Sequence, residues 1–289
     1  ALMAATLVDA KKFSNADLWR KVRVAIDAGR PKAARQAAVL IGAWPAASVV
    51  ELSDSPLRFL AKSASASTRP GAELAALSLM RLASTDPDAA VLQLNERWDR
   101  ALPPDLAAWA WAAVGKQAAL KLMPEATEHF QRAALRASRE GAEPDWPDDT
   151  LAWKVRAALR ADGGRGRWQQ VMQGINAMSA EQQRDPAWVY WKARALQKLS
   201  GNSQDAEGMR GLSRELLASI AGRMHFYGKL AAEDLGQSVE LPGKPAPLTA
   251  EEIEAARNHP GLTRALQLIA LGLRNEGVRE WNFSLRGMD

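Results

Sequence analysis

Hydrophobic residues recur along most of this chain at the three- and four-residue spacing of amphipathic helices. The expected helix starts carry proline in the first turn, as at Pro31 and Pro186, and the expected ends carry glycine, as at Gly42 and Gly236. No stretch alternates convincingly between polar and apolar residues, and we reject the short strand candidate at 49–52. The pattern therefore predicts an all-α fold.

The expected helices pair at a period of roughly 30–45 residues, which is typical of helical solenoids. Two pairs have a degenerate tetratricopeptide spacing. In the second pair, polar Arg210 occupies a position that normally holds a large apolar residue. We predict a right-handed α-superhelix of paired antiparallel helices. The pattern positions are Trp111, Val114, Gly115, Ala118, Ala126, Phe130 and Ala133 in the first pair, and Trp188, Trp191, Ala195 and Ala206 in the second.

A composition break separates the end of this pattern from the last part of the chain. Residues 237–248 contain three prolines and are not expected to be helical. We therefore predict an α-superhelical domain at 1–236, a Pro-rich linker at 237–248 and the start of a small helical domain at 249–289. Thr249-Ala-Glu-Glu252 and Ser179-Ala-Glu-Gln182 have the sequence of capping boxes.

The aromatic composition is unusual, with 11 Trp against 2 Tyr, and alanine makes up about a fifth of the chain. Large indoles beside many alanines are typical of closely packed helices in which Trp fills the gaps. Trp109, Trp111, Trp188 and Trp191 are candidates for stacking on sugar rings. Their helical spacing favours packing in the core.

Several classes of protein are disfavoured by composition. The absence of cysteine excludes disulfides, thiolate metal sites and a Cys nucleophile. The net charge of +5 is spread thinly rather than clustered, which argues against nucleic-acid binding. No apolar run approaches the roughly 18 residues of a membrane span. The chain opens inside an expected helix without an initiator Met or a signal-peptide pattern, so we interpret it as a piece of a longer protein.

The titratable residues form no recognisable catalytic or metal motif. Asp148–Asp149 and Glu251–Glu252 are adjacent in sequence and fit helix first turns, where they would interact with the helix dipole. The three histidines are too scattered for a metal motif. The Gly-rich segment 163–166 lacks the residues of a phosphate loop and is interpreted as a turn between helices. No cofactor is expected.

Two neighbouring helices carry the most specific pattern in the chain, and a third motif follows near its end. They resemble the soluble lytic transglycosylases, in which a W-x-x-W/Y-x-A-R-A helix precedes a (H/S)-F-Y-G-x-L-A-x-E-x-L-G helix. A later E-W-x-F-x-x-R-G-M/F motif is similar to the linker domain of that family. The resemblance covers most of residues 90–289. The matching positions are Trp188, Tyr190, Trp191, Ala193, Arg194, Ala195, His225, Phe226, Tyr227, Gly228, Leu230, Ala231, Glu233, Leu235, Gly236, Glu280, Trp281, Phe283, Arg286, Gly287 and Met288.

The resemblance implies a parent enzyme of the Gram-negative periplasm. Such an enzyme cleaves the β-1,4 bond between N-acetylmuramic acid and N-acetylglucosamine in peptidoglycan and forms a 1,6-anhydro product. Its catalytic Glu lies in an E-S-x-F segment followed by G-L-M-Q, and neither string occurs here. We therefore expect this chain to be a non-catalytic scaffold, with peptidoglycan strands and other cell-wall enzymes as partners. The alternative is a helical-repeat adaptor that binds a protein or peptide.

The resemblance and the helical spacing together give one structural expectation that can be checked directly. We expect Phe226, Tyr227, Leu230 and Ala231 to be mostly buried against the preceding helix that carries two of the tryptophans. His225 is expected to pack or to cap its helix. The alternative is that the rings form an exposed sugar-binding strip.

Overall fold

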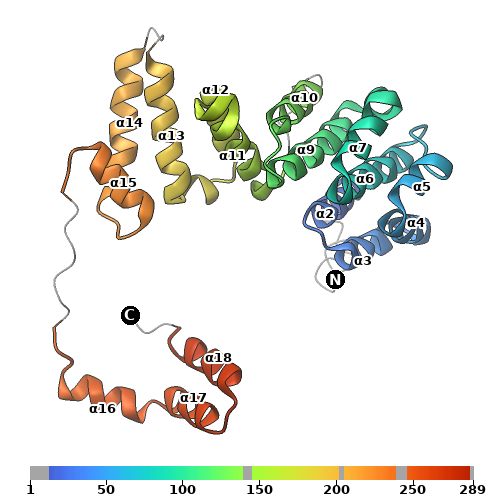
Figure 1. The fold of residues 1–289 in the computed structure, drawn as a ribbon. Coiled ribbons are helices and arrows are strands. Elements are labelled where there is room, and N and C mark those ends of the chain that lie inside the picture. Colours follow the sequence, from blue (N-terminus) through green and yellow to red (C-terminus); the bar gives the residue numbers. More distant parts are fainter. Residues whose placement is uncertain (1–12, 139–144, 202–204, 239–245, 287–289) are drawn as a thin grey trace. The chain divides into compact units, whose positions relative to one another are not determined.

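The computed structural model describes residues 13–138, 145–201, 205–238 and 246–286, and every regular element within them is helical (Figure 1). The predicted all-α fold is therefore confirmed. The chain divides into two compact units, Ala1–Val239 and Glu240–Asp289. The helix expected at the start of the chain lies outside the described residues.

In the first unit, helices that follow one another in sequence pack side by side, as in an α-solenoid. The N-terminal part contains α2 (Asn15–Asp27), α3 (Pro31–Ile41), α4 (Ala43–Asp54), α5 (Pro56–Lys62), α6 (Arg69–Thr85), α7 (Pro87–Gln93), the π-helical turn η1 (Leu94–Trp98) and α8 (Asp99–Ala101). The rest contains α9 (Pro104–Leu120), α10 (Ala126–Ser138), α11 (Asp148–Gly164), α12 (Trp168–Asn176), the 3-10 turn η2 (Gln182–Arg184), α13 (Pro186–Ser200), α14 (Ala206–Ala221) and α15 (Phe226–Asp234).

The sequence signals that begin and end helices act largely as expected. Helices α3 and α13 begin at Pro31 and Pro186, and the Asp185 carboxylate caps α13 by accepting a 2.8 Å hydrogen bond from the Ala187 N–H. Gly236 ends α15 with a φ of 70°, a left-handed conformation that favours glycine. The rejected strand candidate at 49–52 lies within α4.

The predicted capping box at Ser179 is only half formed. The Ser179 hydroxyl accepts from the Gln182 N–H at 3.2 Å, as a cap should. The Ser179 N–H, however, donates to the Asp148 carboxylate of α11 at 2.8 Å rather than to the Gln182 side chain. The prediction was wrong in this respect because a carboxylate from a neighbouring helix binds the same donor.

Helix α9 forms the centre of the first unit and packs against α6, α10 and α11. It is apolar on nearly every face, so it has no polar stripe that could face solvent. Trp109 and Trp111 are buried in it, which confirms core packing for this pair. Their indole N–H groups donate to Asp145 at 2.7 Å and to Asp99 at 2.8 Å.

The first predicted helix pair is α9 and α10. A Cβ atom at Gly115 of α9 would lie 3.0 Å from the ring of Phe130 on α10, which is tighter than ordinary contact. Glycine therefore lets the Phe130 ring lie directly on the α9 backbone. This contact explains why both residues occupy pattern positions of the helical repeat.

Ion pairs with buried members connect elements that lie far apart in sequence. The Lys116 ammonium of α9 lies 2.8 Å from Asp27 of α2 and 2.7 Å from Asp149 of α11. Arg23 of α2 lies 2.6 Å from Glu73 of α6, and both side chains are almost fully buried. Breaking a buried pair leaves a charge without compensation, so these contacts fix which helices pack together.

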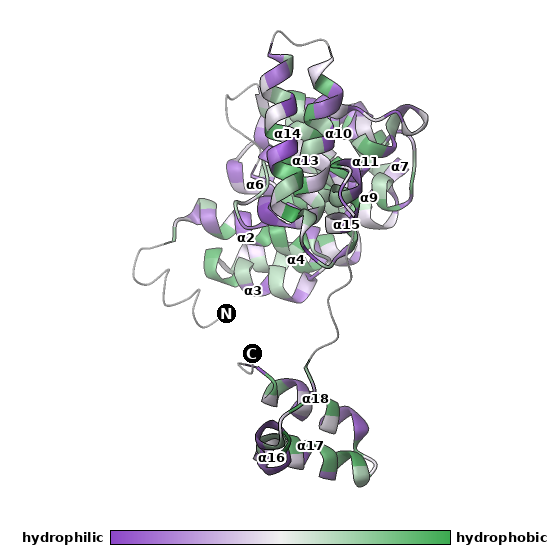
Figure 2. Cartoon of the chain, turned by 90° about the vertical axis from the view of Figure 1, so that its left-hand side faces the viewer, coloured by the Kyte–Doolittle hydropathy of each residue, from purple (hydrophilic) through white to green (hydrophobic). Residues whose placement is uncertain are grey.

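The second unit contains α16 (Ala250–Asn258), α17 (Pro260–Ala270) and α18 (Arg274–Ser284). The capping box predicted at Thr249 and Glu252 is present. Figure 2 shows both hydrophobic and hydrophilic residues along these helices and along α13 and α14. Trp281 of α18 is 37% exposed and Arg286 is also exposed. Part of the predicted linker, 239–245, lies outside the described residues, and the predicted domain boundaries stay a prediction.

Candidate functional site

The HFYG segment, residues 225–228, forms the start of α15, and the structure explains why its first residue is histidine and its last is glycine. His225 is the N-cap, and its Nδ1 accepts a 2.8 Å hydrogen bond from the Gly228 N–H. This confirms the expected capping role. A Cβ atom at Gly228 would collide with the carbonyl oxygens of Arg223 and Ile220. The segment therefore needs a hydrogen-bond acceptor at position 225 and no side chain at position 228.

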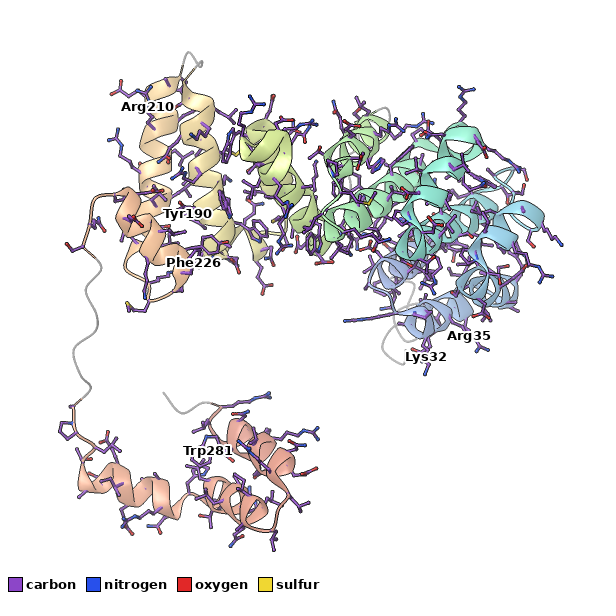
Figure 3. All side chains as sticks on the ribbon, in the orientation of Figure 1. Lys32, Arg35, Tyr190, Arg210, Phe226 and Trp281 are labelled. Carbon is purple, nitrogen blue, oxygen red and sulfur yellow. The ribbon has the colours of Figure 1, made fainter. Side chains whose placement is uncertain are left out.

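The predicted burial of Phe226 is wrong, because its side chain is 68% exposed. The residues of α15 that face its neighbours are Tyr227, Leu230 and Ala231, spaced at i, i+3 and i+4. The spacing from Phe226 to Leu230 fits a helical stripe equally well, so the sequence did not distinguish the two registers. Figure 3 labels Phe226 at the end of the first unit formed by α13, α14 and α15.

The partner surface for α15 also differs from the prediction. Helix α13 presents Val189, Tyr190 and Ala193 to α14 and α15. Its buried Trp188 instead belongs to the main core of the first unit. Trp191 lies between these two groups and is only partly buried. Core packing is therefore confirmed for Trp188, whereas the ring of Trp191 is partly accessible.

The remaining motif residues of α13 and α15 include one structural ion pair. Arg194 of α13 lies 3.0 Å from Asp234 of α15, which ties the two helices together. Burial raises the pKa of the neighbouring Tyr190 phenol above its usual value of 10.0. Glu233 is exposed and has no ion pair among the described residues.

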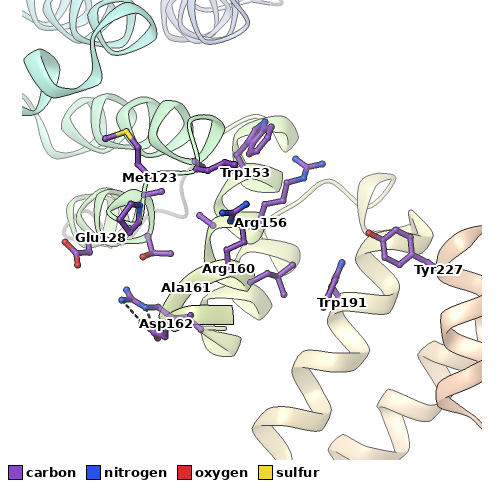
Figure 4. A pocket seen from close by; sticks show the side chains of 18 residues that line it. Met123, Glu128, Trp153, Arg156, Arg160, Ala161, Asp162, Trp191 and Tyr227 are labelled. Carbon is purple, nitrogen blue, oxygen red and sulfur yellow. Dashed lines mark hydrogen bonds and ion pairs between the residues drawn. The ribbon is translucent and has the colours of Figure 1, made fainter. Parts of the chain in front are cut away.

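A groove of about 840 Å³ lies beside these motif helices, entirely within the first unit (Figure 4). Its aromatic lining comes from three helices: Trp153 from α11, Trp191 from α13 and Tyr227 from α15. The turn between α9 and α10 closes the opposite side through Leu122 and Met123. The size is in the range of pockets that bind small ligands.

The charged lining of the groove is predominantly cationic. It contains Arg156, Arg160 and Arg167 against Glu128 and Asp162, so three positive charges face two negative ones and the net charge is +1. Arg167 is paired with Asp162 at 3.4 Å. Arg160 is exposed and forms no ion pair among the described residues.

Within the described part of the chain, Arg156 is held in place by rings rather than by a carboxylate. Its guanidinium lies 4.8 Å from the ring centre of Trp153 and 5.3 Å from that of Trp188. Cation–π contact orients the side chain and leaves its charge unneutralised. Trp153, Arg156 and Arg160 lie at i, i+3 and i+7 of α11, so one helix face supplies a ring and two cations to the groove.

The part of the chain that the structure describes shows no metal-binding arrangement. No group of three or more His, Asp or Glu side chains there could hold a metal ion. None of the helices in the described ranges is long and apolar enough to cross a membrane. The candidate functional feature of the described residues is therefore the ring-lined cationic groove between packed helices.

Comparison with known proteins shows which fold this is. The chain is similar to the lytic transglycosylase Slt of Pseudomonas aeruginosa, solved as an inactive mutant, at 23% identity with a TM-score of 0.57 over 98% of this chain. It is also similar to the 70-kDa soluble lytic transglycosylase of Escherichia coli at 20% identity, with a TM-score of 0.56. A complex of a 70-kDa soluble lytic transglycosylase with bulgecin A gives a TM-score of 0.55 at 20% identity.

These neighbours are longer proteins, because the chain spans only 43–44% of their length. No model of a protein family matches the chain, and no curated protein is significantly similar to it in sequence. The structural neighbours are soluble lytic transglycosylases, as the motifs predicted, and the chain shares the fold of their corresponding part. At this level of identity the likeness concerns the fold.

Sequence reasoning missed the groove. Trp153, Arg156 and Arg160 lie within residues 90–289, most of which resemble the family, but the sequence patterns assigned no role to their side chains. The i, i+3, i+7 spacing of a ring and two arginines on one helix was the available signal. What the sequence could not give was the approach of Trp191 and Tyr227 from two other helices.

Proposed function

We propose that this chain is the helical scaffold of a periplasmic soluble lytic transglycosylase. The parent enzyme would cleave the β-1,4 bond between N-acetylmuramic acid and N-acetylglucosamine in peptidoglycan and form a 1,6-anhydro product. The observation that carries the proposal is the fold likeness over 98% of the chain to two such enzymes. The motif helices α13 and α15, with the His225 cap and the close approach at Gly228, support it independently.

The catalytic acid is proposed to lie in another part of the protein. Glycan cleavage needs a carboxylic acid kept protonated by its surroundings. The E-S-x-F and G-L-M-Q strings that carry it in the family are not in this sequence. The scaffold would hold the catalytic part and present glycan strands to it.

Two measurements test this proposal. The reading frame that encodes this chain should continue into a segment with E-S-x-F and G-L-M-Q. The isolated 289-residue chain should release no anhydromuropeptides from purified peptidoglycan. Turnover by the isolated chain that disappears when one of its own carboxylates is changed to an amide would contradict the scaffold role.

The alternative is a non-enzymatic adaptor that binds proteins through its helical repeats. The packing of Phe130 of α10 against Gly115 of α9 is the observation that favours it, because this contact follows the tetratricopeptide spacing. A reading frame without the two catalytic strings would favour the adaptor over the enzyme.

A further inference from the structure

We propose that the groove between α11, α13 and α15 binds a saccharide that carries carboxylate groups. It would be a glycan-binding site on the scaffold. The inference starts from three observations: partly exposed rings, cations without carboxylate partners among the described residues, and a cavity of about 840 Å³ that these groups share. The choice of peptidoglycan as the source of the saccharide rests on the proposed function.

The rings supply flat surfaces for sugars. The faces of Trp and Tyr rings carry partial negative charge, and the C–H groups on the face of a pyranose carry partial positive charge, so the two stack favourably. Trp153, Trp191 and Tyr227 are each only partly buried and line the same cavity. In Figure 4, Trp153 lies on α11 while Trp191 and Tyr227 lie across the groove from it.

Direct ring contacts connect the groove with Phe226 and pass through the buried ring of Tyr190. Trp191 meets Tyr190 edge-on with ring centres 5.4 Å apart, and Tyr190 lies 5.6 Å from Tyr227. Tyr227 in turn meets Phe226 edge-on at 5.2 Å. Phe226 is 68% exposed, so most of its phenyl ring is accessible to a ligand. A strand of several sugars would cover this ring, which explains its exposure.

The cations select a ligand with carboxylates. Arg156 is held between Trp153 and Trp188, and Arg160 is exposed and unpaired among the described residues. Guanidinium groups bind carboxylates with two parallel hydrogen bonds. In glycan strands of peptidoglycan from which the stem peptides have been removed, every second sugar is an N-acetylmuramic acid with a free lactyl carboxylate, and its pyranose ring offers the face that stacks. Rings and arginines together therefore match a carboxylated glycan.

Other ligands with rings or charge match less well. A nucleic acid also stacks on aromatic rings, but it needs a run of cations along its phosphates, and this groove has a net charge of only +1. An acidic peptide would use the arginines and would leave the rings uncovered. A neutral glycan would use the rings and would leave the arginines without counter-charges.

The test measures binding by calorimetry with the 289-residue chain and four probes. The first probe is peptidoglycan strands from which an amidase has removed the peptides. The others are a chitin hexasaccharide, the free stem peptide and a single-stranded oligonucleotide. The expected result is that the carboxylated strands bind most tightly and that added salt weakens this binding. Equal or tighter binding of any other probe, or no binding of the strands, would overturn the proposal.

Two substitutions, each with a matched control, locate the binding. Arg160→Glu should weaken strand binding about fivefold, whereas Arg58→Glu, the same change at an exposed position on α5, should not. Phe226→Ala should weaken it about threefold to tenfold, whereas Leu135→Ala at a 60% exposed position on α10 should not. If either Arg160→Glu or Phe226→Ala binds the strands as tightly as its control, the site would be overturned.

The outcome is separable from that of the proposed function. If Arg160→Glu and Phe226→Ala do not change strand binding while the full-length protein forms anhydro products, the enzyme assignment would stand and the site would be rejected. Groove-dependent binding without such products would leave the site standing and remove the assignment.

Discussion

Gly228 and Gly211 give opposite predictions for the same Gly→Ala substitution. Gly228 lies in the first turn of α15, where an added methyl group would collide with two backbone carbonyls. Carbonyls of a packed turn cannot move aside as the end of a flexible side chain can. Gly211 lies inside α14 with nothing within 4 Å of the position of a Cβ atom.

The expected magnitudes follow from these surroundings. Overpacking at Gly228 should cost about 3 kcal/mol, and the better helix propensity of alanine offsets about 1 kcal/mol. The net loss in the free energy of unfolding is about 2 kcal/mol. At Gly211 only the propensity gain remains, so alanine should stabilise by about 1 kcal/mol. For a unit of this size, these values correspond to a melting temperature about 4–8 °C lower for Gly228→Ala and about 2–4 °C higher for Gly211→Ala.

Thermal melts monitored by circular dichroism would compare the two variants with the parent chain. In a solenoid each pair of helices depends on its neighbours, so the loss at Gly228 should appear first as faster amide exchange in α13–α15. A shift of the same sign for both substitutions would refute the argument. So would a loss at Gly228 that left amide exchange in α13–α15 unchanged.

Three further predictions concern stability. Phe226→Ala should lower the free energy of unfolding in a thermal melt by about 1–1.7 kcal/mol, which is about a third of the usual 3–5 kcal/mol, because only about a third of this side chain is buried. Lys116→Met should cost about 3–5 kcal/mol in urea unfolding, because it leaves the Asp27 carboxylate buried without its ammonium. Burial disfavours the charged form of Lys116, yet the nearby carboxylates raise the pKa of its ammonium above the usual 10.5. The free energy of unfolding should therefore fall as the pH rises above 10.5, and it should fall less in Lys116→Met. Glu73→Gln should destabilise by about 3 kcal/mol, because it leaves the buried Arg23 guanidinium with only the more distant Asp145 carboxylate at 3.8 Å, and unchanged unfolding would contradict the role of this pair.

Features of the fold that depend on local chemistry could be predicted from the sequence. Proline at Pro31 and Pro186 and the carboxylate of Asp185 act within one helix turn, so their effect does not depend on distant packing. The all-α class follows from the same signals repeated along the chain. The partner of Ser179 was missed because Asp148 reaches it from another helix.

Features that depend on rotation of a helix about its axis could not be predicted. Phe226 and Tyr227 are adjacent, and either could begin an apolar stripe through Leu230. The packing of α15 against Tyr190 rather than Trp188 decides which ring is buried. The groove depends on three such rotations at once, which is why its residues did not stand out in the sequence.

The central claim is that this chain supports a lytic transglycosylase without performing the chemistry, and the products formed from peptidoglycan test it most directly. Purified peptidoglycan would be incubated with the full-length protein and, separately, with the 289-residue chain, and the released muropeptides analysed by mass spectrometry. The account predicts 1,6-anhydromuramic products from the full-length protein and none from the chain alone. Products with reducing muramic ends, or no products from the full-length protein, would contradict it.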